Sequence, residues 1–177
     1  MNVPIVETAR LVLRGHRLDD FEASFAMWSD PVVTRYIGGK PSTEQQTWSR
    51  LMGYVGHWSL MGFGYWVIEE KSSGRFVGEA GFADFRRVIA ASMRDVPEIG
   101  WTLASRFHGK GYATEAVRAV VAWGDVRFGP ARTVCLINAE NLASIRVAQK
   151  CGYAEFERAL FNEQATLFLA RGTFHAA

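Results

Sequence analysis

The chain has 177 residues, 49% of them apolar, and a formal net charge of +2 at pH 7. This length supplies one sizeable hydrophobic core and is too short for two ordinary domains, so we expect a single domain over residues 1–177. The nearly neutral charge disfavours an electrostatic nucleic-acid binder. Cys135 and Cys151 have no His at ligand spacing, which argues against a zinc site or a disulfide scaffold, and no metal is expected.

The N-terminal segment and one uncharged stretch bear on the compartment. Residues 1–10 include Glu7 and Arg10 and lack an apolar core of signal-peptide length, so a reduced cytoplasm is the expected location. Residues 51–68 contain no Asp, Glu, Lys or Arg, but they contain four glycines and change from a helical to a strand-like period. We therefore expect no membrane span.

The first elements in chain order are a short strand and a helix. Residues 10–14 alternate between polar and apolar and predict an edge strand. Asp19 with Glu22 resembles a capping box at the start of a helix that ends before Asp30. The apolar residues at helical spacing are Leu18, Phe21, Phe25 and Trp28.

A second helix is expected after the loop that carries Gly38 and Gly39. Ser42 and Gln45 form another cap signature, and the apolar pattern continues to the glycines near Met61. The face expected to be buried consists of Trp48, Leu51, Met52, Val55 and Trp58.

The second half of the chain alternates between strands and helices. Residues 65–70 and 75–82 flank the turn 71–74 and predict a hairpin, followed by an exposed loop over 83–97. The later pattern predicts strands over 98–103, 133–137, 154–159 and 164–171, and helices over 112–128 and 142–150. This order predicts an α/β (α+β) fold with a mixed, mainly antiparallel sheet and helices on its faces.

A glycine-containing segment joins the strand over 98–103 to the helix over 112–128. It has the sequence RFHGKGYA, residues 106–113, and we call it the glycine loop. Unpaired amides and the positive end of the helix dipole lie at such a junction, so it suits a bulky anion such as a diphosphate. The alternative is an ordinary turn with solvated basic side chains. Walker A and dinucleotide motifs fit less well, because Lys110 lies between the glycines and Thr114 is not Gly or Ala.

The spacing of Arg106, Gly109, Gly111 and Ala113 resembles the acyl-CoA pyrophosphate signature R/Q-x-x-G-x-G/A of the GCN5-related N-acetyltransferases (GNAT). Nearly the whole chain is similar to the ribosomal-protein N-acetyltransferase (RimJ/RimL-like) branch of that family. The segments that carry this resemblance are TARLVLRGHRLDDFEAS, GEAGF, EIGWTL, GKGYATEAV and NAENLASIRVAQKCGY.

The resemblance implies a sheet splayed into a V, with acetyl-CoA as cosubstrate in the opening. It implies a ternary complex in which a primary amine attacks the thioester directly. The residues that it places at the cofactor are Leu103, Arg106, His108, Gly109, Lys110, Gly111, Tyr112, Ala113, Asn141 and Ser144.

Acetyl transfer requires a deprotonated amine, although an amine with a pKa of ~8 to ~10.4 is mostly protonated at neutral pH. Glu98, at the start of its strand, is the first candidate base, acting directly or through water. Its structural alternative is an ion pair with Arg86 or Arg87. Glu79 is the second candidate, because a carboxylate in an otherwise apolar strand could face the same cleft.

The leaving thiolate requires a proton or a hydrogen bond. Asn141 is expected to cap its helix, and in related enzymes the Asn at this position binds the pantetheine arm. Many members of the family carry a Tyr acid seven residues later, where this chain has Ala148. In the RimL-like branch Ser144 would serve instead, with Tyr112 and Tyr153 as reserve hydroxyls.

The sequence leaves the acceptor open between a protein N-terminal amine and a small-molecule amine. A non-catalytic acyl-CoA-binding module is the alternative function, and a nucleotide-binding protein is a weaker one. Most tryptophans are expected in the core, with Trp48 or Trp58 as candidates for an acceptor pocket. Homodimers are common among similar proteins, but no residue here specifies one.

Overall fold

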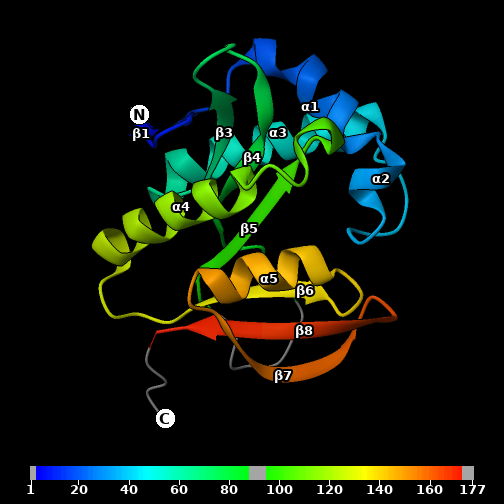
Figure 1. Ribbon diagram of the computed structural model, residues 1–177, viewed down its shortest axis with the longest axis vertical. Coiled ribbons are helices and arrows are strands. Elements are labelled where there is room, and N and C mark those ends of the chain that lie inside the picture. Colours follow the sequence, from blue (N-terminus) through cyan, green and yellow to red (C-terminus); the bar gives the residue numbers. More distant parts are fainter. Residues whose placement is uncertain (1–2, 88–94, 173–177) are drawn as a thin grey trace.

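One mixed sheet of eight strands runs through the computed structural model, which describes residues 3–87 and 95–172 (Figure 1). The strand order is β1-β2-β3-β4-β5-β6-β8-β7, and every neighbouring pair is antiparallel except β5 and β6. The strands are β1 Val6–Glu7, β2 Leu11–Arg14, β3 Tyr65–Glu70, β4 Phe76–Ala83, β5 Glu98–Leu103, β6 Thr133–Asn138, β7 Ala154–Phe161 and β8 Gln164–Arg171. The helices are η1 Leu18–Asp20, α1 Phe21–Trp28, α2 Pro31–Thr34, α3 Glu44–Met61, η3 Ser105–Phe107, α4 Tyr112–Phe128 and α5 Leu142–Lys150.

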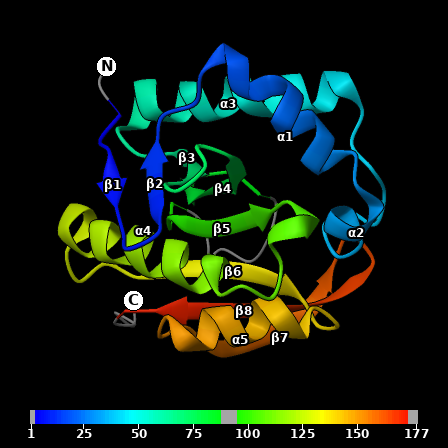
Figure 2. The ribbon, with the colours of Figure 1, turned by 45° about the horizontal axis from the view of Figure 1, so that its top comes forward.

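Helices cover both faces of the sheet. In Figure 2, α1 and α3 lie together above the strands, and α4 and α5 lie in front of them. Every residue of β4 is buried, because its side chains alternate between the two helical layers. Phe82 packs against Gly124 and Phe128 of α4, whereas Glu79 points to α1.

Three tryptophans join α3, β3 and α4 in the core. The ring centroids of Trp58, Trp66 and Trp123 lie 4.7 to 5.5 Å apart in edge-to-face arrangements. Such pairs contribute about 0.5–1.5 kcal/mol beyond the burial of area. The indole nitrogen of Trp58 donates to the Tyr65 carbonyl at 2.9 Å, so this buried polar group is also satisfied.

The sheet opens between its only parallel pair of strands in the described chain. Strands β5 and β6 pair at Glu98 and Val134, and the Val134 amide donates to the Pro97 carbonyl at 3.1 Å. Beyond that point the two strands diverge, as Figure 1 shows. The expected mixed, splayed sheet is therefore confirmed.

The sequence located most elements correctly and missed the short elements β1, α2 and η3. Strands β5 and β8 and helices α4 and α5 have the predicted bounds. Strand β1 and helix α2 were not predicted, since each is too short for a periodic signal. The turn at 71–74 joins β3 and β4 as expected, and part of the predicted loop 83–97 lies outside the described residues.

Both predicted helix caps in the first half require correction. Helix α1 begins at Phe21 with no side-chain cap, and Leu18 is 65% exposed. The Asp20 carboxylate, next to this start, does not cap α1 and accepts instead from the Arg17 amide and from Arg14. The cap of α3 is Thr43, one residue later than predicted, with Gln46 completing the box.

The buried face of α3 also differs from the prediction. Its buried residues are Thr47, Leu51, Tyr54 and Trp58, whereas Trp48, Met52 and Val55 are 42–46% exposed. The stacking of Tyr54 on Tyr65 of β3, at 4.5 Å, fixes the rotation of the helix. No helix in residues 3–87 or 95–172 is long and apolar enough to cross a membrane.

Candidate active site

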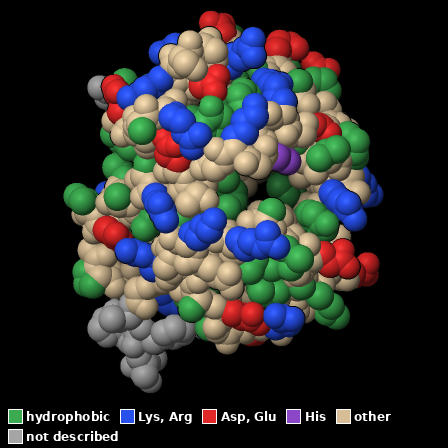
Figure 3. Space-filling view, viewed as in Figure 1, with side chains coloured by type: hydrophobic (Ala, Val, Ile, Leu, Met, Phe, Trp, Pro, Cys, Tyr) green, Lys and Arg blue, Asp and Glu red, His purple; other side chains and the backbone are tan. Residues whose placement is uncertain are grey.

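A cleft of about 450 Å³ lies where β5 and β6 separate. Figure 3 shows the hollow between the part of the molecule that holds α2 and β5 and the part that holds α5 and β6. The cleft wall consists of Trp28, Tyr36, Ile37, Gly38, Arg50, Tyr54, Tyr65, Phe85, Arg87, Glu98, Ile99, Gly100, Trp101, Thr102, Cys135, Leu136, Ile137, Asn138, Asn141 and Ser144. It therefore joins residues from both halves of the sequence.

The glycine loop ends at the N-terminus of α4. Gly109 and Gly111 have φ angles of 74° and 78°, in the left-handed region that glycine adopts without strain. Gly111 caps α4 without a side-chain hydrogen bond, and the Glu115 amide makes the bond to its carbonyl. The amides of residues 112–114 come before this first helical bond, so they have no partner within α4. A Cβ placed on Gly109 would have no atom within 4 Å. This open backbone fits a diphosphate.

Two basic side chains of the glycine loop, Arg106 and His108, contact neighbouring carbonyls. Arg106 Nη2 donates to the Phe76 carbonyl at 3.2 Å, and His108 Nε2 lies 2.8 Å from the Leu103 carbonyl. Leu103 is buried and touches the loop through its backbone. All the predicted cofactor residues from 103 to 113 thus lie at one end of β5, and their contact with a cofactor stays a prediction.

Arg10 supports the glycine loop and was not predicted as a site residue. Its Nη1 donates to the Lys110 carbonyl at 3.0 Å, and its Nε pairs with Glu115 at 2.7 Å. Its guanidinium also lies 4.3 Å from the Tyr112 ring centre. The signal available in the sequence was its position directly before β2, within the first segment that carries the family resemblance.

Neither reserve tyrosine lines the cleft. The Tyr112 ring is buried beside Phe107, and its hydroxyl donates to Glu70, so its side chain points away from the cleft wall. The Tyr153 hydroxyl bonds to Thr133 Oγ1 at 2.7 Å. The side chains of Tyr112 and Tyr153 are therefore packing groups and not hydroxyls of the cleft.

Asn141 and Ser144 lie together in the cleft wall at the start of α5. Asn141 Oδ1 accepts the Ser144 amide at 3.2 Å, which confirms the predicted cap. Ser144 is partly exposed, so its hydroxyl can reach a ligand in the cleft. Ala148, where many relatives carry the Tyr acid, is fully buried one turn further along. Ser144 is the hydroxyl of α5 that lines the cleft.

Glu98 lies in the cleft wall as a paired carboxylate. Arg87 Nε and Nη2 donate to its two oxygens at 2.7 and 2.9 Å, which confirms the ion pair that the sequence offered as the alternative. Burial lowers the pKa of Arg87, but Glu98 outweighs burial and the net shift is upward. Each carboxylate oxygen retains a lone pair for water. Arg86 pairs elsewhere, with Asp84 and Asp95.

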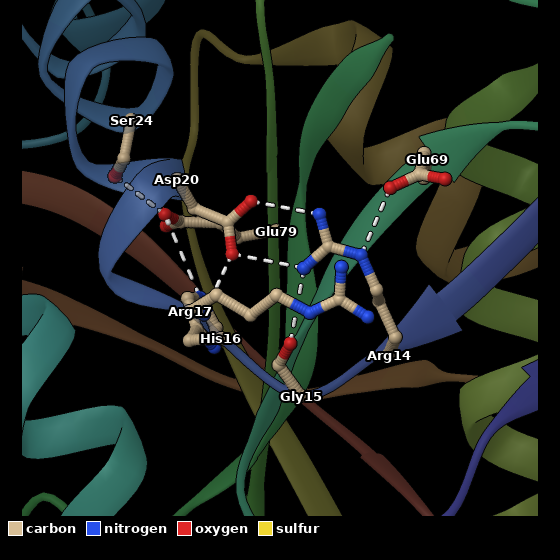
Figure 4. A network of polar contacts seen from close by, with 8 residues as sticks. All are labelled: Arg14, Gly15, His16, Arg17, Asp20, Ser24, Glu69 and Glu79. Carbon is tan, nitrogen blue, oxygen red and sulfur yellow. Dashed lines mark hydrogen bonds and ion pairs between the residues drawn. The ribbon is translucent and has the colours of Figure 1, made fainter. Parts of the chain in front are cut away.

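Glu79 does not line the cleft. Figure 4 shows its carboxylate beside Ser24 and His16. It is 1% exposed; one oxygen accepts from Ser24 at 2.6 Å and the other from the Trp28 indole at 2.9 Å. His16 Nε2 is 3.7 Å away. Burial alone raises the pKa of Glu79, but contacts with His16, Ser24 and Trp28 lower it overall. These surroundings fit a residue that positions Trp28 and do not fit a base for an amine in the cleft.

Aromatic rings form the side of the cleft opposite Asn141 and Ser144. They are Trp28, Tyr36, Tyr54, Tyr65, Phe85 and Trp101. Burial raises the pKa of Tyr54 and Tyr65, so both phenols are neutral. The candidates Trp48 and Trp58 do not belong to this wall: Trp48 lies on the outer face of α3 and Trp58 is in the core. The tryptophans that line the cleft are Trp28 and Trp101.

A hydrogen bond from Ser105 to Asp30 joins the aromatic side to the glycine loop. Ser105 Oγ donates to Asp30 Oδ2 at 2.6 Å, and Asp30 Oδ1 accepts the Val32 amide as the cap of α2. Both bonds lower the pKa of Asp30, with Ser105 contributing most. At Asp30 the sequence indicated only the end of a helix. The contact with Ser105, which lies 75 positions further along the chain, was not predictable from it.

Two further predictions concern cysteines and metals. Cys135 lines the cleft but is 1% exposed, and burial raises the pKa of its thiol, as it does for Cys151. Neither thiol is therefore an activated nucleophile. In the described part of the chain, no three His, Cys, Asp or Glu side chains group as metal ligands.

Comparison with known proteins identifies the family. Residues 10–154 match the acetyltransferase (GNAT) domain. The chain is 30% identical to the uncharacterized N-acetyltransferase YoaA of Bacillus subtilis over 151 residues, 85% of this chain and 82% of YoaA. It is 33% identical to the FsC-acetyl coenzyme A-N(2)-transacetylase of Aspergillus fumigatus over 173 residues, 92% of this chain and 70% of that protein.

Solved structures agree with this assignment. A structure named as a GnaT-family acetyltransferase of Bordetella pertussis has 34% identity and a TM-score of 0.85, covering 96% of this chain and 99% of its own. RimL, the ribosomal L7/L12 α-N-protein acetyltransferase, has a TM-score of 0.76 at 17% identity, covering 97% of this chain and 95% of its own. This second likeness shows a shared fold.

Proposed function

This chain belongs to the GNAT family of acetyltransferases, and we propose that it acetylates the primary amine of a small molecule by direct attack in a ternary complex with acetyl-CoA. One observation carries the proposal. Asn141 and Ser144, beside the expected pantetheine arm, line the same cleft as the aromatic wall that can receive an acceptor. Donor and acceptor would therefore meet without a covalent enzyme intermediate.

The reaction exchanges a C–S bond for a C–N bond. The amine nitrogen attacks the thioester carbonyl carbon, the sulfur leaves with the bonding electrons, the nitrogen loses a proton and the sulfur gains one. Acetyl-CoA supplies the activated acetyl group and the leaving thiolate. The glycine loop holds the diphosphate, Asn141 holds the pantetheine arm, and Ser144 donates to the thiolate.

Glu98 is the proposed proton acceptor, acting through a water. Its oxygens line the cleft but are held by Arg87, so a bridging water would carry the proton from the amine to a remaining lone pair. The same ion pair fixes the carboxylate in one position, and this lowers the entropy cost of positioning the water.

Two features of the cleft support a small acceptor over a protein N-terminus. Its volume of about 450 Å³ lies in the range of small-molecule pockets, and aromatic rings provide most of the acceptor wall. A peptide would need an extended surface with backbone hydrogen-bonding partners.

The test is release of free CoA thiol from acetyl-CoA in the presence of single amines. The panel should contain amino acids, arylalkylamines, polyamines and peptides with varied N-termini. We expect turnover with small amines that exceeds turnover with peptides. Turnover with peptides alone would contradict the choice of acceptor. Tight acetyl-CoA binding by calorimetry without turnover on any amine would favour a non-catalytic acyl-CoA-binding module.

A further inference from the structure

The acceptor side of the cleft holds a guanidinium that has no carboxylate partner among the described residues. Arg50 of α3 lines the cleft, with its guanidinium carbon 3.6 Å from the centre of the Trp28 ring. Its Nη1 donates to Ser42 Oγ over 3.5 Å, at the outer limit for such a bond. Stacking on an indole stabilises the cation but leaves its charge without a counter-ion.

Arg87, the other arginine in the cleft wall, is arranged differently. Both oxygens of Glu98 accept from Arg87, so this charge is neutralised within the protein. Arg50 is thus the arginine of the cleft wall whose charge a ligand could neutralise. A partly buried charge that finds a partner only on binding contributes selectivity for that partner.

Carboxylates in and behind the cleft are already engaged. Glu98 is the only Asp or Glu in the described cleft wall, and Glu79 behind Trp28 accepts from Ser24 and the indole. A second ammonium group on the acceptor, as in a polyamine, would find no free carboxylate there. The acceptor side therefore disfavours added positive charge.

A second depression continues the cleft outward past Arg50. It has a volume of about 800 Å³ and shares Ile37, Gly38 and Arg50 with the cleft. The rest of its wall consists of Lys40, Pro41, Ser42, Gln45, Gln46 and Ser49. Among these described residues are a second cation and several hydrogen-bond donors, and no carboxylate. Figure 3 shows Lys and Arg side chains around the hollow.

The orientation of the guanidinium suits a planar anion. The indole contacts its face, so the N–H groups point outward in the plane, where a carboxylate accepts two parallel hydrogen bonds. Glu79 fixes the indole from behind through its 2.9 Å hydrogen bond, so the stacking surface is rigid. Arg50 is preorganised for such a partner.

We propose that the acceptor amine also carries a carboxylate, which binds Arg50 while the aromatic wall holds the carbon skeleton between the two groups. This inference rests on the proposed acetyltransferase function and adds the substrate class, an amino-acid-like amine. Lys40 extends the positive surface outward and favours acceptors with a further anionic or polar group.

A binding experiment without turnover tests this directly. We choose 3-phenylpropionate and its neutral amide, 3-phenylpropanamide, as probes that differ only in charge and lack the reactive amine. Calorimetry in the presence of CoA should show at least tenfold tighter binding of the acid. In Arg50→Gln this preference should fall to about twofold or less, and Arg50→Lys should retain part of it.

Arg35→Gln is the matched control, because it removes the same charge nearby. Arg35 is exposed, stacks on Tyr36 and does not line the cleft. The control should keep the preference for the acid. Equal binding of the two probes by the unmodified protein, or an unchanged preference in Arg50→Gln, would overturn the proposal. So would an equal loss in Arg35→Gln, since it would indicate general electrostatics.

Turnover separates this inference from the proposed function. With phenylalanine and phenethylamine as acceptors, kcat/KM should favour phenylalanine at least tenfold, and Arg50→Gln should remove the difference mainly through KM. Efficient turnover of phenethylamine or polyamines with no preference for the carboxylate refutes the substrate class and leaves the acetyltransferase function intact. No thiol release with any amine, together with acid-selective binding, refutes the proposed function alone.

Discussion

The two sides of the cleft are built in different ways. On the cofactor side, the glycine loop and the start of α5 present backbone amides, glycines and a helix cap from two short segments. On the acceptor side, most of the wall consists of side chains, which come from α1, α3, β3, β5 and the segments beside them. Backbone groups recognise a diphosphate in the same way in every chain that forms the turn. Side chains make recognition specific to one chain.

This difference separates what the family shares from what it varies. A cosubstrate common to many enzymes needs the same turn, whereas the acceptor wall can change by substitution at separate positions without altering the sheet. Glu98 lies where the two sides meet, at the point where β5 parts from β6. Four substitutions test whether a change on one side of the cleft leaves the function of the other side unaltered.

The largest expected effect is on the leaving group. If Ser144 donates to the thiolate, Ser144→Ala should lower kcat by about tenfold to a thousandfold, in the range of a lost general acid. Acetyl-CoA affinity, measured by calorimetry, should change little, because Asn141 and the glycine loop remain. An enzyme with full kcat would remove Ser144 from the reaction.

The second effect concerns Glu98 and the pH profile. Glu98→Gln should lower kcat/KM by about tenfold to a hundredfold at pH 7 and recover part of the loss as pH approaches the pKa of the acceptor amine, where deprotonation needs no assistance. For an α-amine that recovery should begin near pH ~8, and for a lysine-like amine near pH ~10.

The control for Glu98 addresses its ion pair. Arg87→Lys keeps a cation but loses the two-pronged hydrogen bond to Glu98. It should therefore change the size of kcat/KM but should not show the recovery at higher pH that is expected of Glu98→Gln. A loss in Glu98→Gln that is uniform across pH would identify Glu98 as a positioning residue for Arg87.

A third substitution tests the backbone cradle. Gly111→Val should weaken acetyl-CoA binding about tenfold or more, because φ is 78° at this position and a β-branched side chain is strained there. Gly74→Val, at φ 65° in the turn between β3 and β4, places similar strain far from the loop. Calorimetry should show normal affinity for the Gly74 variant; equal weakening in both would argue against the cradle.

The smallest expected effect is on stability and comes from behind the acceptor wall. Glu79→Gln should lower the free energy of unfolding by about 1–2 kcal/mol, because Ser24 and Trp28 donate to different oxygens of Glu79 and Gln replaces one of these with an NH2 donor. The folded pKa of Glu79 is below its ordinary value of 4.5, so its ionisation stabilises the fold above about pH 4.5. That contribution is lost as pH falls through the folded pKa.

Denaturant unfolding at several pH values checks this prediction. The difference between wild type and Glu79→Gln should be largest at neutral pH and should shrink below pH 4.5. The cofactor side should not respond, so acetyl-CoA affinity should stay unchanged at pH 7. A difference independent of pH would mean that packing, and not the charge of Glu79, sets the effect.

The sequence by itself determined most elements and the local structure of the glycine loop and of the start of α5. Periodicity placed α4, α5, β5 and β8 with the observed bounds, because each is long enough to show a clear pattern. The glycine spacing and the Asn141 cap were predictable for a related reason: both depend on contacts within a few residues, as the 3.2 Å bond from the Ser144 amide shows.

The tertiary structure alone decided the acceptor side and the surroundings of the two carboxylates. Glu98 was the first candidate base in the sequence and Glu79 the second, and only the structure shows that Glu98 lines the cleft with Arg87 whereas Glu79 is enclosed behind Trp28. The buried face of α3 was predicted in part: Leu51 and Trp58 are buried as expected, but Trp48, Met52 and Val55 are exposed. Tyr54, which stacks on Tyr65, is buried instead. Such contacts join residues separated by tens of positions, and local periodicity carries no information about them.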